Sequence, residues 1–237
     1  MMRVFPPLAA TAAGYFGSMV ESYDSLIRRC VPRYAEMTDR LLDYLPAKAE
    51  RVLELGCGTG NLSLRLAAGY PAAAITFIDA APEMIEIARS RLHAAHPRAF
   101  EQATFLTARF EDLDLPAASF DLVTSCISLH HVRDKASLYR RLFDSLAPGG
   151  AFRFADQLRG ATPAIHDLNW RLWLEFCRAP GNCSAEEVES LLDHAAAHDH
   201  YTPLREQFAL LEAAGFASCD CVWRNLIWGI VTADRPT

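Results

Sequence analysis

A glycine-rich turn between a short apolar segment and a helix-forming segment constrains this chain most strongly. The apolar segment is Arg51–Leu55, and the turn after it reads Gly-Cys-Gly-Thr-Gly from Gly56 to Gly60. Glycine is required where the backbone must take a positive φ or come close to a ligand. Because the turn follows a predicted strand of an open α/β sheet, it lies where such sheets bind their ligands. The sequence therefore predicts a ligand site at the end of the first strand.

The spacing of the glycines separates this turn from two other ligand-binding motifs. The dinucleotide fingerprint is G-x-G-x-x-G, whereas this chain reads G-x-G-x-G, and no Lys-Ser or Lys-Thr pair follows to make a P-loop. The next strand-like segment, Ala74–Ile78, ends at Asp79, whose carboxylate is placed to accept hydrogen bonds from both ribose hydroxyls. A free 2′-hydroxyl is therefore expected. A nicotinamide-binding Rossmann domain is the alternative.

Strand and helix patterns alternate after residue 50, which predicts a parallel sheet covered by helices on both faces. Two helices without an intervening strand follow, and an antiparallel pair joined near Asn225 closes the chain. The predicted fold is α/β: a Rossmann-like, mostly parallel seven-stranded sheet, its last strand antiparallel, with a helical lid. Its predicted parts are an N-terminal helical cap (1–46), a cofactor-binding core (47–157 and 203–237) and a lid insertion (158–202).

Composition and charge favour an enzyme for a small molecule over a nucleic-acid binder. The chain has 237 residues and a formal net charge of −6. Binding to a polyanion usually requires a basic balance or stripe, so the charge argues against nucleic acid without excluding it. The seven cysteines include no C-x-x-C pair and predict buried thiols in a reducing compartment. We find no signal-peptide pattern and no apolar run long enough to span a membrane, so we expect a cytoplasmic protein without membrane contact.

Several segments, in this order, resemble the class I S-adenosylmethionine-dependent methyltransferases. They are the E-x-G-x-G-x-G loop from Glu54, the acidic Asp79, and the segments FEDLDLP (110–116), SFDLVTS (119–125) and LAPGGAF (146–152). The resemblance covers roughly residues 50–157. It implies a Rossmann-like fold, S-adenosyl-L-methionine as cofactor and transfer of its methyl group, with S-adenosyl-L-homocysteine as product.

The same resemblance implies roles for residues along one edge of the sheet. The backbone of Gly56–Gly58 would hold the methionine part of the cofactor, and Asp79 its ribose. Family members usually carry an acidic residue after the third strand, near the adenine, but this chain has Arg109 there. Glu111 and the N–H of Phe110 are the expected substitutes, and the alternative is that Arg109 is a solvated surface side chain. The predicted cofactor-binding residues are Tyr34, Glu54, Gly56, Cys57, Gly58, Asp79, Ala80, Met84, Arg109, Phe110 and Cys126.

Both ends of the chain show a narrower similarity to the tRNA wobble-uridine carboxymethyltransferases, which use carboxy-S-adenosylmethionine. The matching segments are Tyr23-Asp24, Val31–Tyr34 and Leu211–Gly229. This similarity implies that Tyr34 contacts the cofactor; the alternative is that it packs the N-terminal helix onto the sheet. Those enzymes need a lid arginine for the extra carboxylate. Residues 186–200 contain neither arginine nor lysine, so we expect the ordinary cofactor.

One histidine is the candidate for proton transfer. His130 follows the fourth predicted strand, where family members place residues that face the methyl group. A base is needed when the acceptor must lose a proton, as a hydroxyl must, and the NPPY-type motif for planar amino groups is absent. We therefore predict methyl transfer to a small molecule, with oxygen favoured and His130 as the base. The alternatives are that His130 only packs, that the chain is a tRNA-modifying relative, or that it binds the cofactor without catalysis.

The predicted lid contains histidines and aromatic residues with less specific patterns. His194 and His198 have the i, i+4 spacing of a metal pair. However, Asp193–Asp199 is predicted to be an exposed helix end, where the dipole favours histidine, so no metal site is predicted. The aromatic residues predict core packing, an apolar acceptor pocket or a dimer face, which leaves a homodimer open. They include Trp170, Trp173 and Phe176.

Overall fold

A sheet of eight strands organises the part of the chain that the computed structural model describes, residues 11–18 and 20–237. The strands lie in the order β3-β2-β1-β4-β5-β8-β7, and the two-residue strand β6 pairs with β5. Their bounds are β1 Arg51–Leu55, β2 Ala74–Asp79, β3 Thr104–Thr107, β4 Phe120–Cys126, β5 Leu146–Arg159, β6 Thr202–Pro203, β7 Ala217–Asn225 and β8 Trp228–Asp234.

The direction of the strands confirms the predicted Rossmann-like α/β fold. Strands β1 to β5 are parallel where they pair, whereas β8 runs antiparallel to both β5 and β7. Strand β5 continues to Arg159, two residues into the segment predicted as the lid insertion (158–202). The strand continues through polar residues because Asp156 and Gln157 pair with Gly229 and Trp228 on β8.

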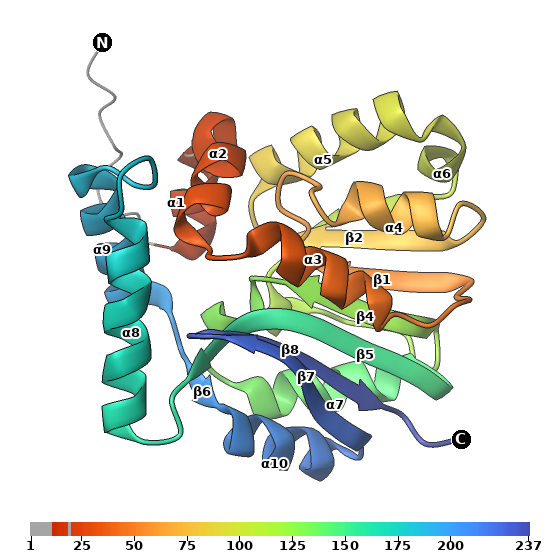
Figure 1. Cartoon of the computed structure of the whole chain (residues 1–237). Coiled ribbons are helices and arrows are strands. Elements are labelled where there is room, and N and C mark those ends of the chain that lie inside the picture. The colour runs from red at the N-terminus through yellow and green to blue at the C-terminus, as the bar shows by residue number, and fades with distance from the viewer. Residues whose placement is uncertain (1–10, 19) are drawn as a thin grey trace.

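Helices cover both faces of this sheet (Figure 1). One face carries α3 (Tyr34–Asp43), α4 (Ser63–Gly69), α5 (Pro82–Ala95) and α6 (Pro97–Glu101), and the other carries α7 (Lys135–Ser145) and α10 (Leu204–Ala214). Each helical layer buries apolar side chains against the sheet. Phe77 and Leu66 lie in one apolar cluster, and Phe152 and Leu142 lie in the other.

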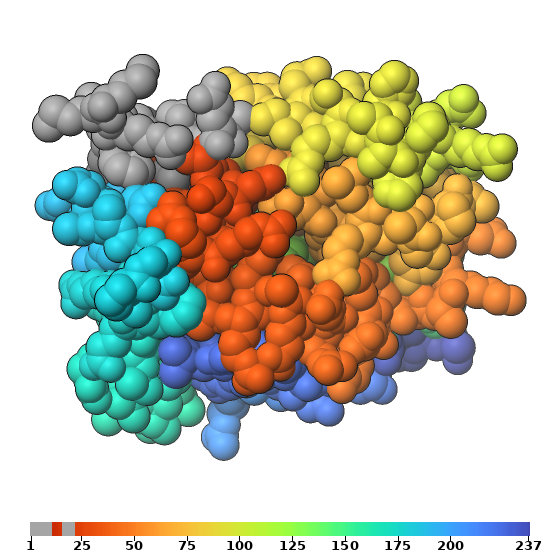
Figure 2. Space-filling view, turned by 45° about the horizontal axis from the view of Figure 1, so that its top comes forward, coloured from red at the N-terminus to blue at the C-terminus, as the bar shows by residue number. Residues whose placement is uncertain are grey.

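The remaining helices gather at one end of the sheet (Figure 1). They are α1 (Ala12–Ser18), α2 (Val20–Cys30), α8 (Pro163–Cys177) and α9 (Ala185–His198). Figure 2 shows the N-terminal helices in red and orange against the lid helices in cyan, as one continuous surface. Residues 1–10 of the predicted cap lie outside the described part. Among the helices that are described, none has the length and apolar character needed to cross a membrane.

Specific polar contacts join the N-terminal helices to the lid helices. The indole Nε1 of Trp173 on α8 donates to the carbonyl of Cys30 at the end of α2 (2.8 Å). The guanidinium of Arg29 donates to both carboxylate oxygens of Glu187 on α9 (2.6 Å each). Such bidentate pairing fixes orientation as well as distance. The two helical segments therefore cover the end of the sheet as one layer.

Candidate functional site

A cleft of about 420 Å³ opens at the carboxyl ends of β1 and β4. Here the strand order reverses, because β2 lies on one side of β1 and β4 on the other. Open α/β sheets bind ligands at this topological position. Of the predicted cofactor-binding residues, seven line the cleft: Gly56, Gly58, Asp79, Ala80, Met84, Arg109 and Phe110.

The glycine turn is held against the end of β2 by backbone hydrogen bonds. The N–H of Gly56 donates to the carbonyl of Ile78 (2.8 Å), and the N–H of Gly58 donates to Oδ2 of Asp79 (2.8 Å). Gly56 has a φ of 68°, and a Cβ at this position would lie 2.3 Å from Cβ of Ser128. No side chain fits there, so the turn presents bare backbone to the cleft.

Asp79 is positioned as a hydrogen-bond acceptor in the cleft wall. Its Oδ1 accepts from the N–H of Ala81 (2.9 Å), while Oδ2 accepts from Gly58. Burial raises the pKa of this carboxyl, and the backbone donors of Ala81, Gly58 and Ala80 oppose that rise. A carboxylate has about four acceptor positions in total. The carboxylate therefore keeps acceptor capacity toward the cleft.

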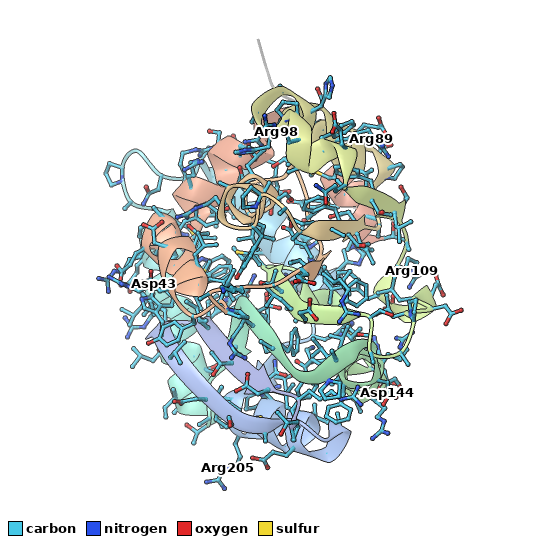
Figure 3. All side chains as sticks on the ribbon, turned by 90° about the vertical axis from the view of Figure 1, so that its right-hand side faces the viewer. Asp43, Arg89, Arg98, Arg109, Asp144 and Arg205 are labelled. Atoms are coloured by element: carbon cyan, nitrogen blue, oxygen red, sulfur yellow. The ribbon has the colours of Figure 1, made fainter. Side chains whose placement is uncertain are left out.

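Arg109 marks the outer mouth of the cleft. Its side chain is 64% exposed and lies 3.6 Å from the carboxylate of Glu111. Figure 3 shows Arg109 at the margin of the molecule. Its side chain thus lines the cleft and is exposed to solvent at the same time.

Four other predicted residues are not among those that line the cleft. Glu54 is buried beneath the turn, where its Oε2 accepts from the hydroxyl of Ser63 (2.6 Å). Burial raises the pKa of Glu54 to about 8, although the Ser63 hydrogen bond opposes it. Cys57 is buried, Cys126 is half-buried, and Tyr34 packs against the apolar cluster of its face.

A residue of α2 that sequence reasoning gave no role ties this helix to the glycine turn. Oδ1 of Asp24 accepts from the hydroxyl of Thr59 (2.5 Å) and from Nδ2 of Asn61 (2.9 Å), and its Oδ2 pairs with Arg91 (2.9 Å). Tyr23, the preceding residue, lines the cleft. The sequence analysis noted the pair Tyr23-Asp24 only for its similarity to another family. The partners of Asp24 lie 35 or more residues further along the chain, and no local pattern indicates them.

A second, deeper cavity of about 60 Å³ adjoins the cleft. Tyr23 and Ile127 line both spaces. Ile127 has a φ of 61°, which is rare for a β-branched residue, and its N–H donates to the carbonyl of Ala155 (2.8 Å). Much of the remaining wall is aromatic. The aromatic wall residues include Tyr15, Trp173, Tyr201 and Trp228.

Polar groups also face this cavity. His130 lies in its wall, and Nδ1 of His130 is 2.5 Å from Oδ1 of the buried Asp156. Burial opposes protonation of His130, but the charges of Asp156 and Asp199 outweigh it and raise its pKa. Within the described part of the chain, Oε1 of Gln157 and Nε1 of Trp228 are buried in the same wall without a hydrogen-bond partner. A ligand in the cavity therefore meets one acceptor and one donor.

The predicted helix end at Asp193–Asp199 is present, since α9 ends at His198, but the prediction that it is exposed is wrong for His194 and Asp199. His194 is 5% exposed and its ring stacks on that of Tyr15, with centroids 4.2 Å apart, and the side chain of Asp199 is 3% exposed. The chain turns inward after α9 because the N–H of His200 donates to the carbonyl of His130 (2.7 Å). That contact is between residues 70 positions apart, so local helix patterns gave no sign of it.

Comparisons with known proteins agree with this geometry. Residues 52–150 match the family model described as a methyltransferase domain. The chain is 34% identical over 129 residues to 27-O-demethylrifamycin SV methyltransferase of Amycolatopsis mediterranei, covering 54% of this chain and 46% of that protein. It is 25% identical over 226 residues to carboxy-S-adenosyl-L-methionine synthase of Aeromonas salmonicida, covering 92% and 90% respectively. The chain thus spans about half the length of the first relative and most of the second.

Among solved structures, the fold matches phosphoethanolamine N-methyltransferase 2 of Haemonchus contortus in complex with S-adenosyl-L-methionine. The TM-score is 0.69 at 14% identity, over 95% of this chain and 59% of that one. Fold, cleft and bare glycine turn together define a Rossmann-like domain that binds an adenosyl cofactor. Residues 52–150 match a methyltransferase domain, and the chain is similar to methyltransferases that use S-adenosylmethionine; both findings support S-adenosyl-L-methionine as its cofactor. The bare turn and the carboxylate of Asp79 fit this cofactor.

Replacing Asp79 with alanine should weaken binding of S-adenosylhomocysteine at least about 10-fold, because hydrogen bonds to a charged group contribute about 1.5–3 kcal/mol each. The N–H of Gly58 also loses its acceptor in this variant. Titration calorimetry of the wild type, Asp79→Ala and the control Asp144→Ala measures the effect. Asp144 is a half-exposed carboxylate on α7. Equal affinities for all three proteins would contradict the placement of Asp79.

The raised pKa of Glu54 predicts a pH-dependent stability. Between its ordinary pKa and about 8, the folded protein keeps a proton that the unfolded chain has lost. The free energy of unfolding should therefore fall as pH rises through this range, and a shift of one pKa unit corresponds to about 1.4 kcal/mol. Denaturant melts at pH 5 and pH 8 should show a smaller fall for Glu54→Gln than for the wild type. The exposed Glu83→Gln is the control, and an unchanged slope in Glu54→Gln would contradict the prediction.

Proposed function

We propose that this chain transfers the methyl group of S-adenosylmethionine to an oxygen atom of a small molecule. The observation that supports this most directly is the shared wall of the cleft and the deeper cavity, formed by Tyr23 and Ile127. When bound in the cleft, the cofactor supplies an electrophilic methyl group. The chain must then hold an acceptor in line with that group and exclude water.

The cavity wall indicates the kind of acceptor. Its aromatic side chains suit an apolar or planar body, and its volume of about 60 Å³ admits a reacting group more readily than a whole large molecule. The unpartnered Nε1 of Trp228 and Oε1 of Gln157 offer a donor and an acceptor to the same ligand. Leaving such groups unpaired beside a ligand costs affinity, so they favour an acceptor with matching polar atoms.

His130 supports oxygen as the acceptor atom. A hydroxyl must lose its proton during methyl transfer, and a buried histidine oriented by a carboxylate is a common arrangement for that step. His130 has this arrangement through its short contact with Asp156. The name of the relative from Amycolatopsis mediterranei denotes a rifamycin substrate, and a small-molecule substrate of that kind agrees with the present proposal.

The cap (1–46) and the lid (158–202) are proposed as the parts that enclose the acceptor, since residues of α1, α2, α8 and α9 line the cavity. We also propose a reducing, cytoplasmic location, which the seven free cysteines support.

A second function is favoured by one observation. The similarity to carboxy-S-adenosyl-L-methionine synthase of Aeromonas salmonicida extends over 92% of this chain, whereas the methyltransferase match of higher identity covers 54%. Formation of a carboxylated cofactor is therefore the second candidate. Against it, residues 186–200 offer no arginine or lysine to a carboxylate in the lid.

Mass spectrometry distinguishes the two functions. The protein is incubated with S-adenosylmethionine and a panel of phenols, hydroxy acids and amines. The proposal expects S-adenosylhomocysteine together with a hydroxyl compound that has gained one methyl group. Methylation of amines alone would contradict the choice of oxygen. In a parallel incubation that adds small carboxylic acids as carboxyl donors, a carboxylated cofactor together with the decarboxylated acid would replace the proposal by the second candidate.

Replacing His130 with asparagine should lower kcat about 10²-fold or more, in the range typical of a lost acid–base group, while affinity for S-adenosylhomocysteine changes little. Asparagine is chosen because its amide can still donate a hydrogen bond to Asp156, so the buried carboxylate keeps a donor. Steady-state kinetics and calorimetry give the two values, with His93→Ala on α5 as control. A normal kcat in His130→Asn would leave His130 a packing residue.

A further inference from the structure

Three imidazole nitrogens surround one buried carboxylate oxygen at the boundary between the cleft and the cavity. The oxygen is Oδ1 of Asp199. It lies 3.1 Å from Nδ1 of His131, 3.6 Å from Nε2 of His194 and 3.8 Å from Nε2 of His130. All four side chains are at most 16% exposed. They come from the turn after β4, from α9 and from the segment after α9, so the fold has assembled the group. We call these four residues the His–Asp cluster.

Within the described residues, the oxygen at the centre of the cluster, Oδ1 of Asp199, lacks an aligned hydrogen-bond donor. This oxygen is buried, and its nearest donor among these residues is Nδ1 of His131 at 3.1 Å, an ion-pair contact without the alignment of a regular hydrogen bond. The second oxygen, Oδ2, accepts from the hydroxyl of Tyr201. A buried carboxylate oxygen without a donor is strongly unfavourable, and such an atom in a native fold calls for an ion or a ligand.

We propose that the His–Asp cluster binds a divalent transition-metal ion, with His130, His131 and Asp199 as ligands and His194 as a fourth. Metal–ligand bonds of about 2.0–2.1 Å at tetrahedral angles place neighbouring ligand atoms about 3.3 Å apart. The distances from Oδ1 of Asp199, 3.1 to 3.8 Å, lie on both sides of this value. The ligand atoms of His130, His131 and Asp199 all lie within 4.8 Å of one another. Imidazole with one carboxylate is a set that zinc and ferrous iron prefer.

The residues around the cluster are arranged as metal sites usually require. Ligating histidines generally donate their other ring N–H to a carboxylate, which fixes the orientation of the ring. Nδ1 of His130 has this partner in Asp156, and Oδ2 of Asp199 has its own partner in Tyr201. Two of the proposed ligands are therefore held from behind, with Nε2 and Oδ1 left toward the centre.

The catalytic part of this inference rests on the proposed function, whereas metal binding itself does not. His131 lines the cleft, and His130 and Asp199 line the cavity, so a bound ion would face both spaces. A hydroxyl oxygen that coordinates such an ion loses its proton more readily, in this case to solvent. With the ion bound, His130 is a ligand that positions it and the ion activates the hydroxyl in its place, so His130 acts as the base only in the metal-free protein. Its replacement lowers kcat in both cases.

Metal binding is tested on the full chain after dialysis against a chelator. Zinc or cobalt is added, excess is removed, and bound metal is measured by mass spectrometry of the elements. We expect one equivalent in the wild type and in His93→Ala, whose histidine lies on α5 away from the cluster. Asp199→Asn and His131→Ala should lose it. Asp156→Asn should bind about 10–100-fold more weakly, as outer partners of metal ligands usually do.

A second measurement keeps the test decisive if a variant does not fold. Cobalt bound to the wild type should give visible absorption typical of a four- or five-coordinate site, and imidazole NMR signals should shift for the cluster histidines alone. Less than stoichiometric metal in the wild type, or full retention in both ligand variants, would overturn the inference. Calorimetry with S-adenosylhomocysteine separates the two proposals, because lost cofactor binding with normal metal binding would defeat the proposed function alone.

Discussion

The hydrogen bond from the N–H of Gly58 to Asp79 joins the two parts of the cofactor cleft that must act together. It links the turn after β1 to the end of β2, beside the N–H of Gly56, which is bound to the carbonyl of Ile78. A backbone this close to a neighbouring strand leaves no space for a side chain at Gly56, where Ser128 lies directly opposite. The cleft is thus bounded by backbone on one side and by a carboxylate on the other, as an adenosyl group requires.

Local sequence patterns were sufficient to predict the strands and the glycine turn that form the cofactor cleft. The apolar run Arg51–Leu55, the glycines after it and the acidic end of the next strand are each a short-range signal, and the structure has β1 with the predicted bounds. The helical segments after residue 162 were also predicted correctly as two helices, α8 and α9. Local patterns are less reliable for the residue at which a strand or helix ends. β5 continues through polar residues because it pairs with β8, and pairing of that kind is not visible from either strand alone.

The placement of α2 and of the segment after α9 depends on contacts between residues far apart in sequence. The sequence analysis did not reveal these contacts. Asp24 reaches Thr59 and Asn61 across the chain and so sets α2 over the glycine turn. The segment after α9 looked like a solvated helix end because Asp, His and Ala alternate there without an apolar stripe. Its burial follows from one backbone contact, between His200 and His130, and from the ammonium of Lys135, which donates to the carbonyls of Val132 and His200.

The turn after α9 places the carboxylate of Asp199 in the interior. A buried charge is unfavourable unless an opposite charge or hydrogen bonds compensate for it. Asp156 pairs with His130, and Lys135 is satisfied by carbonyls, but Asp199 has one oxygen with a hydrogen bond and one without. Removing one partner from a buried charge pair typically destabilises a protein by about 3–5 kcal/mol. Asp199 lies in the connection that follows α9. A ligand bound at the proposed His–Asp cluster would therefore also stabilise the position of α9 over the cavity, since any ligand specific to the folded state stabilises the conformation it binds.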